Sequence, residues 1–173
     1  MTLPGNFGPT LKPDFLALLH ELFAAEVEYV VVGGVAAILE GAPVTTLDLD
    51  IVYSPDQDNL QRLLALLKKL DARYRDPAGR DIRPTLERLR SHKINLLETK
   101  LGPLDAMQSI GAQWTWNDVE ERSHLLEVGK LAIRVLDLAA IIESKVAADR
   151  DKDRAMLPVL RQTLEESRRP NED

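Results

Sequence analysis

The sequence predicts an α/β (α+β) fold, in which a small mixed β-sheet is flanked by helices and a helical layer follows at the C-terminus. Two β-branched runs, at 29–32 and 44–53, alternate with segments whose leucines recur at helical spacing. Two hairpin patterns come next, and the chain from residue 137 onward has a helical pattern. The 173 residues are 45% hydrophobic, which is enough for the core of one domain covering 1–173.

The N-terminal part predicts a helix, a strand and a second helix, in that order. After a loose segment at 1–13, Asp14 is placed to cap a helix over 14–25. The apolar stripe of this helix consists of Phe15, Leu18, Leu19 and Leu22. The run at 29–32 predicts a buried strand, Gly33-Gly34 a tight turn, and 35–40 the helix that this turn opens.

The strand predicted over 44–53 has two different faces. Successive side chains of a strand point to opposite sides, so Asp48 and Asp50 share one face and are expected to point outward. The apolar set on the other face is expected to point into the core; it consists of Leu47, Leu49 and Ile51.

The remaining chain predicts helices around two hairpins. Ser54-Pro55-Asp56 begins a helix with a leucine stripe (Leu60, Leu63, Leu64, Leu67 and Leu70), and 71–90 is a loop with one short helix around Leu86. The hairpins pair 93–98 with 104–110, and 124–128 with 131–135, the second at an edge of the sheet. Asp137 caps the first of two C-terminal helices, the second covers 152–166, and a polar tail occupies 167–173.

Composition excludes several classes of function. The formal net charge of -6 argues against an electrostatic grip on long nucleic acid. The absence of cysteine excludes disulfides, thiolate zinc sites and cysteine nucleophiles. No apolar run approaches the length of a membrane span, and the N-terminus lacks the pattern of an export signal. We therefore expect a cytoplasmic protein without a membrane partner.

Asp48-Leu49-Asp50 is the pattern that most directly indicates chemistry. Two carboxylates on one face of a strand can share a divalent cation such as Mg²⁺ or Mn²⁺. Upstream, Gly33 and Gly34 precede a helix, where backbone N–H groups attract phosphate and a side chain would hold the phosphate away. A phosphate site and a metal site are thus predicted in one cleft.

Each of these patterns also has a plainer interpretation. An Asp-x-Asp pair can be the solvent face of a half-buried sheet. For a third carboxylate, Asp105 competes with Glu98, and either can be a surface acid. Trp114 and Trp116, with Asn117 capping the segment after them, can stack a base or anchor a loop.

Taken together, the glycine pair, the break at Gly41 and the run Thr45-Thr46-Leu47-Asp48-Leu49-Asp50-Ile51 resemble the signature of the nucleotidyltransferase superfamily with the DNA polymerase β type fold. The segments Gly102-Pro103-Leu104-Asp105, Ile142-Glu143-Ser144-Lys145 and Arg150-Asp151-Lys152-Asp153 resemble bacterial minimal nucleotidyltransferases, including toxin-like members related to AbiEii and MNT. The resemblance covers most of Tyr29 to Leu164.

The resemblance implies that a nucleoside monophosphate moves from a nucleoside triphosphate to a hydroxyl of RNA, protein or a small molecule, with loss of pyrophosphate. Two metal ions held by Asp48, Asp50 and Asp105 would assist this displacement. The implied nucleotide-binding residues are Gly33, Gly34, Lys145, Arg150 and Lys152, of which the last three either neutralise phosphate or hold the helical layer in place.

Two other functions remain open from the sequence. Many relatives carry an arginine where this chain has Val44, and this departure favours a catalytically silent fold that binds a nucleotide or a protein, such as a cognate antitoxin. The intact carboxylates favour the enzyme. The third hypothesis is an interaction domain that binds no nucleotide.

Overall fold

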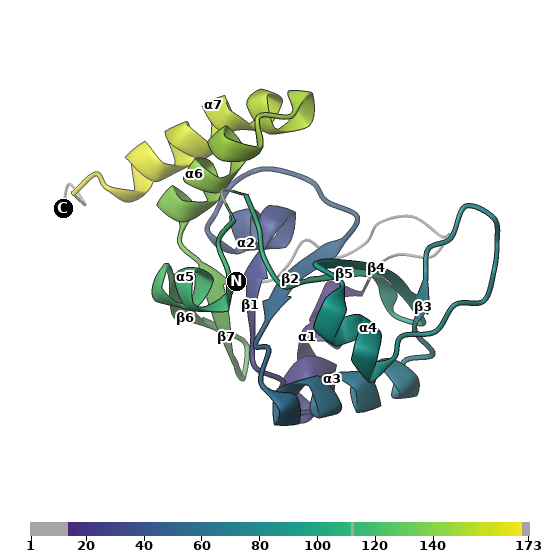
Figure 1. Cartoon of the computed structure of the whole chain (residues 1–173). Helices are drawn as coiled ribbons and strands as arrows, with labels where there is room; N and C mark the ends of the chain where they lie inside the picture. Colours follow the sequence, from purple (N-terminus) through teal and green to yellow (C-terminus); the bar gives the residue numbers. More distant parts are fainter. Residues whose placement is uncertain (1–13, 112, 171–173) are drawn as a thin grey trace.

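The computed structural model describes residues 14–111 and 113–170, and its centre is a seven-stranded mixed sheet (Figure 1). The strands are β1 (Tyr29–Val32), β2 (Leu49–Tyr53), β3 (Arg73–Tyr74), β4 (Ile94–Thr99), β5 (Gly102–Met107), β6 (Ser123–Val128) and β7 (Leu131–Leu136). Their order in the sheet is β3-β4-β5-β2-β1-β7-β6, so β6 is an edge, as predicted. The predicted loose segment 1–13, and residues 171–173 of the predicted tail, lie outside the described residues.

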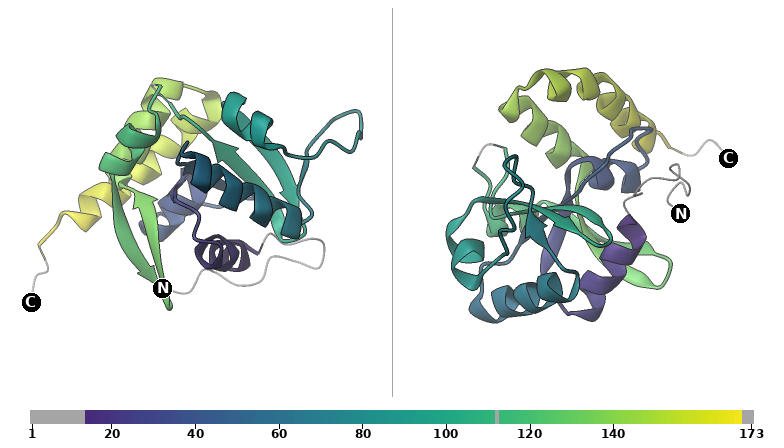
Figure 2. Two further views of the ribbon diagram at one scale, coloured as in Figure 1. Left: turned by 60° about the horizontal axis from the view of Figure 1, so that its bottom comes forward. Right: turned by 90° about the vertical axis from the view of Figure 1, so that its right-hand side faces the viewer.

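Helices pack around this sheet on separate sides. They are α1 (Phe15–Ala24), α2 (Gly33–Leu39), α3 (Gln57–Lys69), α4 (Leu86–Ser91), α5 (Trp116–Glu121), α6 (Leu138–Ala148) and α7 (Asp151–Ser167). Figures 1 and 2 show α1 and α3 at one end of the molecule and the α6–α7 pair at the other, which confirms the helical layer at the C-terminus. In the described parts of the chain, no helix combines the length and the apolar character needed to cross a membrane.

The first helix forms for the reasons that the sequence predicts. The Asp14 carboxylate accepts a hydrogen bond from the Ala17 N–H at 2.9 Å, which satisfies one of the unpaired donors in the first turn. The predicted stripe is buried, and it consists of Phe15, Leu18, Leu19 and Leu22. Burial of these apolar side chains against the sheet stabilises the helix more than its own backbone can.

One parallel pairing joins two locally antiparallel units. Strand β1 pairs antiparallel with β2, and β4 pairs antiparallel with β5. Strand β5 then lies parallel beside β2, with Asp50 in Cα register with Asp105. Because side chains at register positions of adjacent strands share a face, both carboxylates lie on the same side of the sheet.

Several predicted details are wrong, and each has a local reason. The strand predicted over 44–53 begins only at Leu49, and the Leu47 side chain is 72% exposed, because strand pairing does not extend to that position. Helix α2 includes Gly33 and Gly34, which were expected to form a separate turn. Strand β3 was missed, because it lies inside the segment predicted to be a loop; it pairs with β4.

The tryptophan segment also differs from its prediction. Thr115 caps α5 through a capping box with Asp118, so Asn117 is a helical residue and not the cap. Trp114 is buried, and the Arg122 guanidinium lies 4.6 Å from its ring centre. This environment supports the loop-anchor interpretation of Trp114.

A buried asparagine ties the start of β1 to the end of β2. The Asn59 amide donates hydrogen bonds to Glu28 O at 3.0 Å and to Ser54 O at 2.9 Å, and its carbonyl oxygen accepts from Glu28 N–H at 2.7 Å. The side chain is fully buried. The Glu28 carbonyl also accepts a hydrogen bond from the Ser54 N–H at 3.1 Å, so Asn59 matters most for the Glu28 N–H and the Ser54 carbonyl.

We expect Asn59→Ala to lower the free energy of unfolding by roughly 2 to 4 kcal/mol, because it leaves buried backbone groups without partners. Urea denaturation measures this loss. The control is Asp58→Ala, a change at the exposed neighbouring position on α3, which is expected to cost less than about 0.5 kcal/mol. Equal losses in the two variants would contradict the role of Asn59.

Candidate functional site

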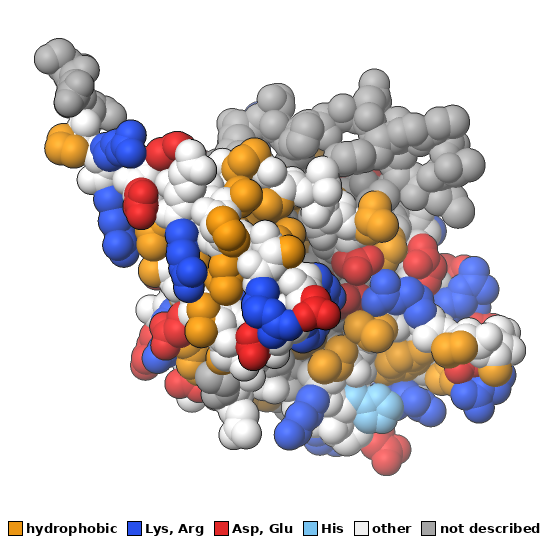
Figure 3. All heavy atoms as spheres, turned by 90° about the horizontal axis from the view of Figure 1, so that it is seen from above, with side chains coloured by type: hydrophobic (Ala, Val, Ile, Leu, Met, Phe, Trp, Pro, Cys, Tyr) orange, Lys and Arg blue, Asp and Glu red, His pale blue; other side chains and the backbone are white. Residues whose placement is uncertain are grey.

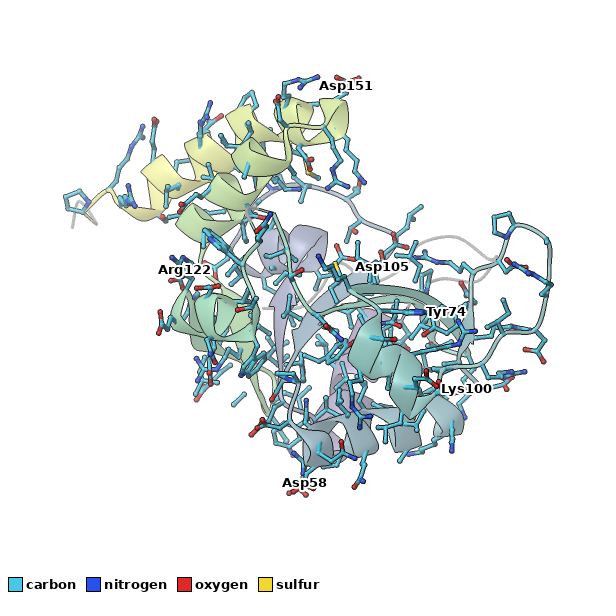
Figure 4. The ribbon with its side chains drawn as sticks, in the orientation of Figure 1. Asp58, Tyr74, Lys100, Asp105, Arg122 and Asp151 are labelled. Carbon is cyan, nitrogen blue, oxygen red and sulfur yellow. The ribbon has the colours of Figure 1, made fainter. Side chains whose placement is uncertain are left out.

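The strand register brings the predicted acids to one region of the sheet. Asp50 lies on β2, Asp105 lies beside it on β5, and Asp48 immediately precedes β2. The rival third acid, Glu98, lies one strand further out on β4, opposite Pro103. The geometry therefore favours Asp105 over Glu98 as the partner of Asp50. Figure 4 shows Asp105 on the side of the sheet that faces the α6–α7 pair.

The two glycines allow the backbone to approach this region closely. Gly33 has a φ of +64°, which disfavours other residues, and an added Cβ would overlap the Asp50 carboxylate. A Cβ on Gly34 would lie 2.6 Å from Thr46 Cβ. The first turn of α2 is thus in contact with the acid-bearing segment, and any side chain at Gly33 would require Asp50 to move.

The carboxylates perturb one another. Burial raises the pKa of Asp50 to about 7, and the negative charges of Asp105 and Asp48 add to this shift. A hydrogen bond with Asp105 favours the protonated form of Asp50, while the positive charge of Lys145 on α6 opposes it. Burial also raises the pKa of Asp105, against the opposing influence of Arg75. Ionisation of all three aspartates at once is therefore unfavourable in these surroundings.

A cation that the sequence did not single out lies among these acids. The Arg75 guanidinium pairs with Asp48 Oδ1 at 3.3 Å and also with Asp105 Oδ1. Arg75 follows β3 in the segment predicted to be a loop, where no periodicity or motif marked it. Long-range contact, and not a local pattern, places it in the site.

The donor chemistry fits a divalent cation. Within the described residues, no three His, Asp or Glu side chains are arranged to hold a metal together. However, the three aspartates offer the oxygen ligands that Mg²⁺ and Mn²⁺ prefer, and the position between Asp48 and Asp105 already accepts the positive charge of Arg75.

Among the predicted basic residues, Lys145 is the one whose positive charge lowers the pKa of Asp50. Its side chain is 15% exposed, and its ammonium lies 3.3 Å from Asp153 Oδ1 on α7. Asp153 is buried and also accepts from Arg150 Nε at 2.6 Å. Although burial opposes it, these bonds hold the pKa of Asp153 below its ordinary value. Arg150 thus holds the junction between α6 and α7, one of the two roles predicted for it, and Asp153 was missed as the centre of this network.

The other charged side chains of the junction are exposed. Arg154 pairs with Asp149 at 2.8 Å and with Asp151, and both acids are largely exposed. Figure 4 shows Asp151 at the outer tip of the helical pair, far from Asp105. Lys152 is exposed on the first turn of α7. Asp151 therefore does not lie near the acids of the sheet.

A histidine links the two helices that border the site. His124 Nε2 lies 2.9 Å from Glu40 Oε1, just after α2, and Nδ1 lies 2.5 Å from Asp137 Oδ1, just before α6. Burial raises the pKa of Glu40, while the charge of His124 lowers it. This contact joins the glycine-bearing helix to the lysine-bearing helix.

Comparisons with known proteins agree with this fold. The model of a family described as a nucleotidyltransferase of unknown function (DUF6036) matches residues 16–161. A search of curated proteins found no match. The family match over residues 16–161 does not test membership of the AbiEii-like subgroup, which stays a prediction.

Three solved structures are among those with a similar fold. TM1012 of Thermotoga maritima, a proposed nucleotidyltransferase, has a TM-score of 0.55 and 17% identity, over 91% of this chain and 96% of that one. The lincosamide antibiotic adenylyltransferase LnuA, bound to lincomycin, has a TM-score of 0.60 and 14% identity, over 86% and 95%. ANT(2″)-Ia with adenylyl-2″-tobramycin has a TM-score of 0.54 and 17% identity, over 87% and 89%.

We expect Asp50→Asn to stabilise the metal-free protein at pH 8 and to have little effect near pH 4. The ordinary pKa of 3.8 rises to about 7 on folding, so the folded state binds more protons between these values and loses stability as the pH rises. The expected gain at pH 8 is on the order of 2 kcal/mol. Thermal melts in EDTA at both pH values measure it, with Asp58→Asn as the control. A gain independent of pH would count against this assignment.

Gly33→Ala should destabilise the protein more than Gly79→Ala. Both glycines have positive φ, but a Cβ on Gly79 meets nothing within 4 Å, whereas one on Gly33 meets Asp50. We expect about 1 kcal/mol for Gly79→Ala from backbone strain alone and roughly 3 kcal/mol for Gly33→Ala. Urea denaturation compares them, and similar losses would show that the contact with Asp50 is unimportant.

Proposed function

Because the chain belongs to a nucleotidyltransferase family, DUF6036, we propose that it transfers a nucleoside monophosphate from a nucleoside triphosphate to a hydroxyl acceptor in a reaction that depends on Mg²⁺ or Mn²⁺. One observation supports this proposal above the others. The register between β2 and β5 sets Asp50 beside Asp105, and Gly33 contacts the Asp50 carboxylate. The proposed metal ligands and the proposed phosphate-binding backbone are therefore neighbours.

In the proposed reaction, the acceptor oxygen forms a bond to the α-phosphorus as the bond to pyrophosphate breaks, and the hydroxyl releases its proton to water. Bound by Asp48, Asp50 and Asp105, the divalent ion would lower the pKa of the hydroxyl and offset the charge of pyrophosphate. Asp48, with its side chain 38% exposed, lies on the more open side of the group.

Phosphate binding is assigned to the backbone and to one lysine. The N–H groups in the first turn of a helix have no partner within that helix, and the first turn of α2 begins at Gly33, beside the Asp50 carboxylate. Lys145 reaches the neighbourhood of Asp50 while Asp153 holds its ammonium. Because the lysine side chain is already held in place, its conformational entropy is not lost when a phosphate binds.

We propose a small molecule as the acceptor. Two of the structural neighbours were solved with lincomycin or with adenylyl-2″-tobramycin bound. The net charge of -6 disfavours a polyanionic acceptor such as RNA. On the face shown in Figure 3, acidic and basic side chains are interspersed, and the basic ones form no continuous stripe.

The test is a transfer assay with each of the four α-labelled nucleoside triphosphates and Mg²⁺ or Mn²⁺. Small-molecule extract, RNA and protein are offered as separate acceptor pools. We expect label in the small-molecule pool, and we expect Asp48→Asn to lower transfer by about 100-fold or more, since loss of a metal ligand removes several kcal/mol of transition-state stabilisation. Asp58→Asn, the same change on the distant α3, should leave transfer unchanged (Figure 4).

The outcomes separate the three hypotheses. Equal label with wild type and Asp48→Asn would reject the proposed enzyme. Thermal stabilisation by a nucleotide without transfer would indicate a binding module. Neither transfer nor stabilisation would indicate an interaction domain, and label in the RNA or protein pool would correct the acceptor alone.

A further inference from the structure

Arg75 has a fixed backbone and a long reach across the sheet. Its N–H donates to Leu96 O on β4 at 3.0 Å, and the preceding Tyr74 N–H donates to Ile82 O at 2.8 Å. Leu96 lies directly opposite Asp105 in the register of β4 and β5. The Arg75 side chain therefore starts beside β4, at the level of Asp105, and crosses that strand to reach the acids.

The guanidinium is the positive charge most directly in contact with the proposed metal ligands. It contacts Oδ1 of Asp48 and Oδ1 of Asp105, while Lys145 is held by Asp153. The Arg75 side chain is 32% exposed, so it borders solvent on one side. The contact thus neutralises Asp48 and Asp105 at a position that solvent reaches.

This contact and a bound metal exclude one another electrostatically. A divalent ion needs the oxygens that the guanidinium now occupies, and two cations held a few ångströms apart repel. An arriving triphosphate supplies new negative charge, to which a planar guanidinium can bind in a bidentate manner. Because the backbone is held by these hydrogen bonds, a move of the guanidinium toward a phosphate would take place by rotation about side-chain bonds.

We propose that Arg75 is a movable counter-ion and a nucleotide-binding residue: it pairs with Asp48 and Asp105 in the empty site, and leaves them for a phosphate of the nucleotide when metal and nucleotide enter. The nucleotide half of this inference rests on the proposed function, whereas the metal half does not. It assigns Arg75 a role in substrate binding that no motif in the sequence indicated.

The test measures binding and needs no acceptor. Mn²⁺ is titrated into the nucleotide-free protein and followed by electron paramagnetic resonance. We expect Arg75→Gln to bind Mn²⁺ about tenfold more tightly than wild type, since a competing charge is removed. The four nucleoside triphosphates are then titrated one at a time with Mn²⁺ present, and we expect the one that wild type binds best to bind Arg75→Gln about tenfold more weakly.

Arg83→Gln is the matched control. It removes the same charge from the same segment, but Arg83 pairs with Asp71 and Asp81 outside the site. We expect it to change neither affinity. Arg75→Lys keeps the charge without the bidentate fork, so it should raise Mn²⁺ affinity less than Arg75→Gln does and serves as the test if Arg75→Gln fails to melt cooperatively.

Opposite changes in the two affinities support the proposal, because a merely structural arginine would lower both. Two falling affinities, or no change in Mn²⁺ affinity, would overturn it. If wild type binds no nucleotide, the nucleotide half fails together with the proposed function, while a rise in Mn²⁺ affinity would still support the metal half.

Discussion

Repulsion between carboxylates is the constraint on which this structure depends. The register of β2 and β5 sets Asp50 beside Asp105, and Asp48 adds a third negative charge. Such a group is stable only with positive charge or protons nearby. The fold supplies both: Arg75 contacts two of the acids, and burial shifts Asp50 toward its protonated form. The same imbalance is what makes the group suited to bind a cation.

The elements around the three aspartates either contact these acids or supply positive charge near them. Gly33 lets the start of α2 lie against the Asp50 carboxylate. Lys145 on α6 acts on Asp50 from the other side, and its ammonium is held by the buried Asp153 on α7. His124 connects the end of α2 with the start of α6. The site is therefore bordered by helices that are tied to one another as well as to the sheet.

The sequence predicts those parts of the fold that local patterns encode. The β-branched run at 29–32 located β1, and the hairpin pattern placed Asp105 on a strand, which the structure sets beside Asp50. The pattern failed at Leu47, because alternation continues past the end of strand pairing. Arg75 and Asn59 could not be assigned, since their partners lie about thirty residues away and no periodic or motif signal marks them. The catalytic and binding roles of the predicted residues stay predictions.

The parallel contact between β2 and β5 also affects how the protein reaches its native state. The β1–β2 pair and the β4–β5 hairpin consist of antiparallel partners that each form within one stretch of chain. Asp50 and Asp105 meet only when these two units dock, a non-local step that is slow in folding because a long loop must close first. Nascent or partly folded chains thus lack the assembled group of acids until β2 and β5 pair.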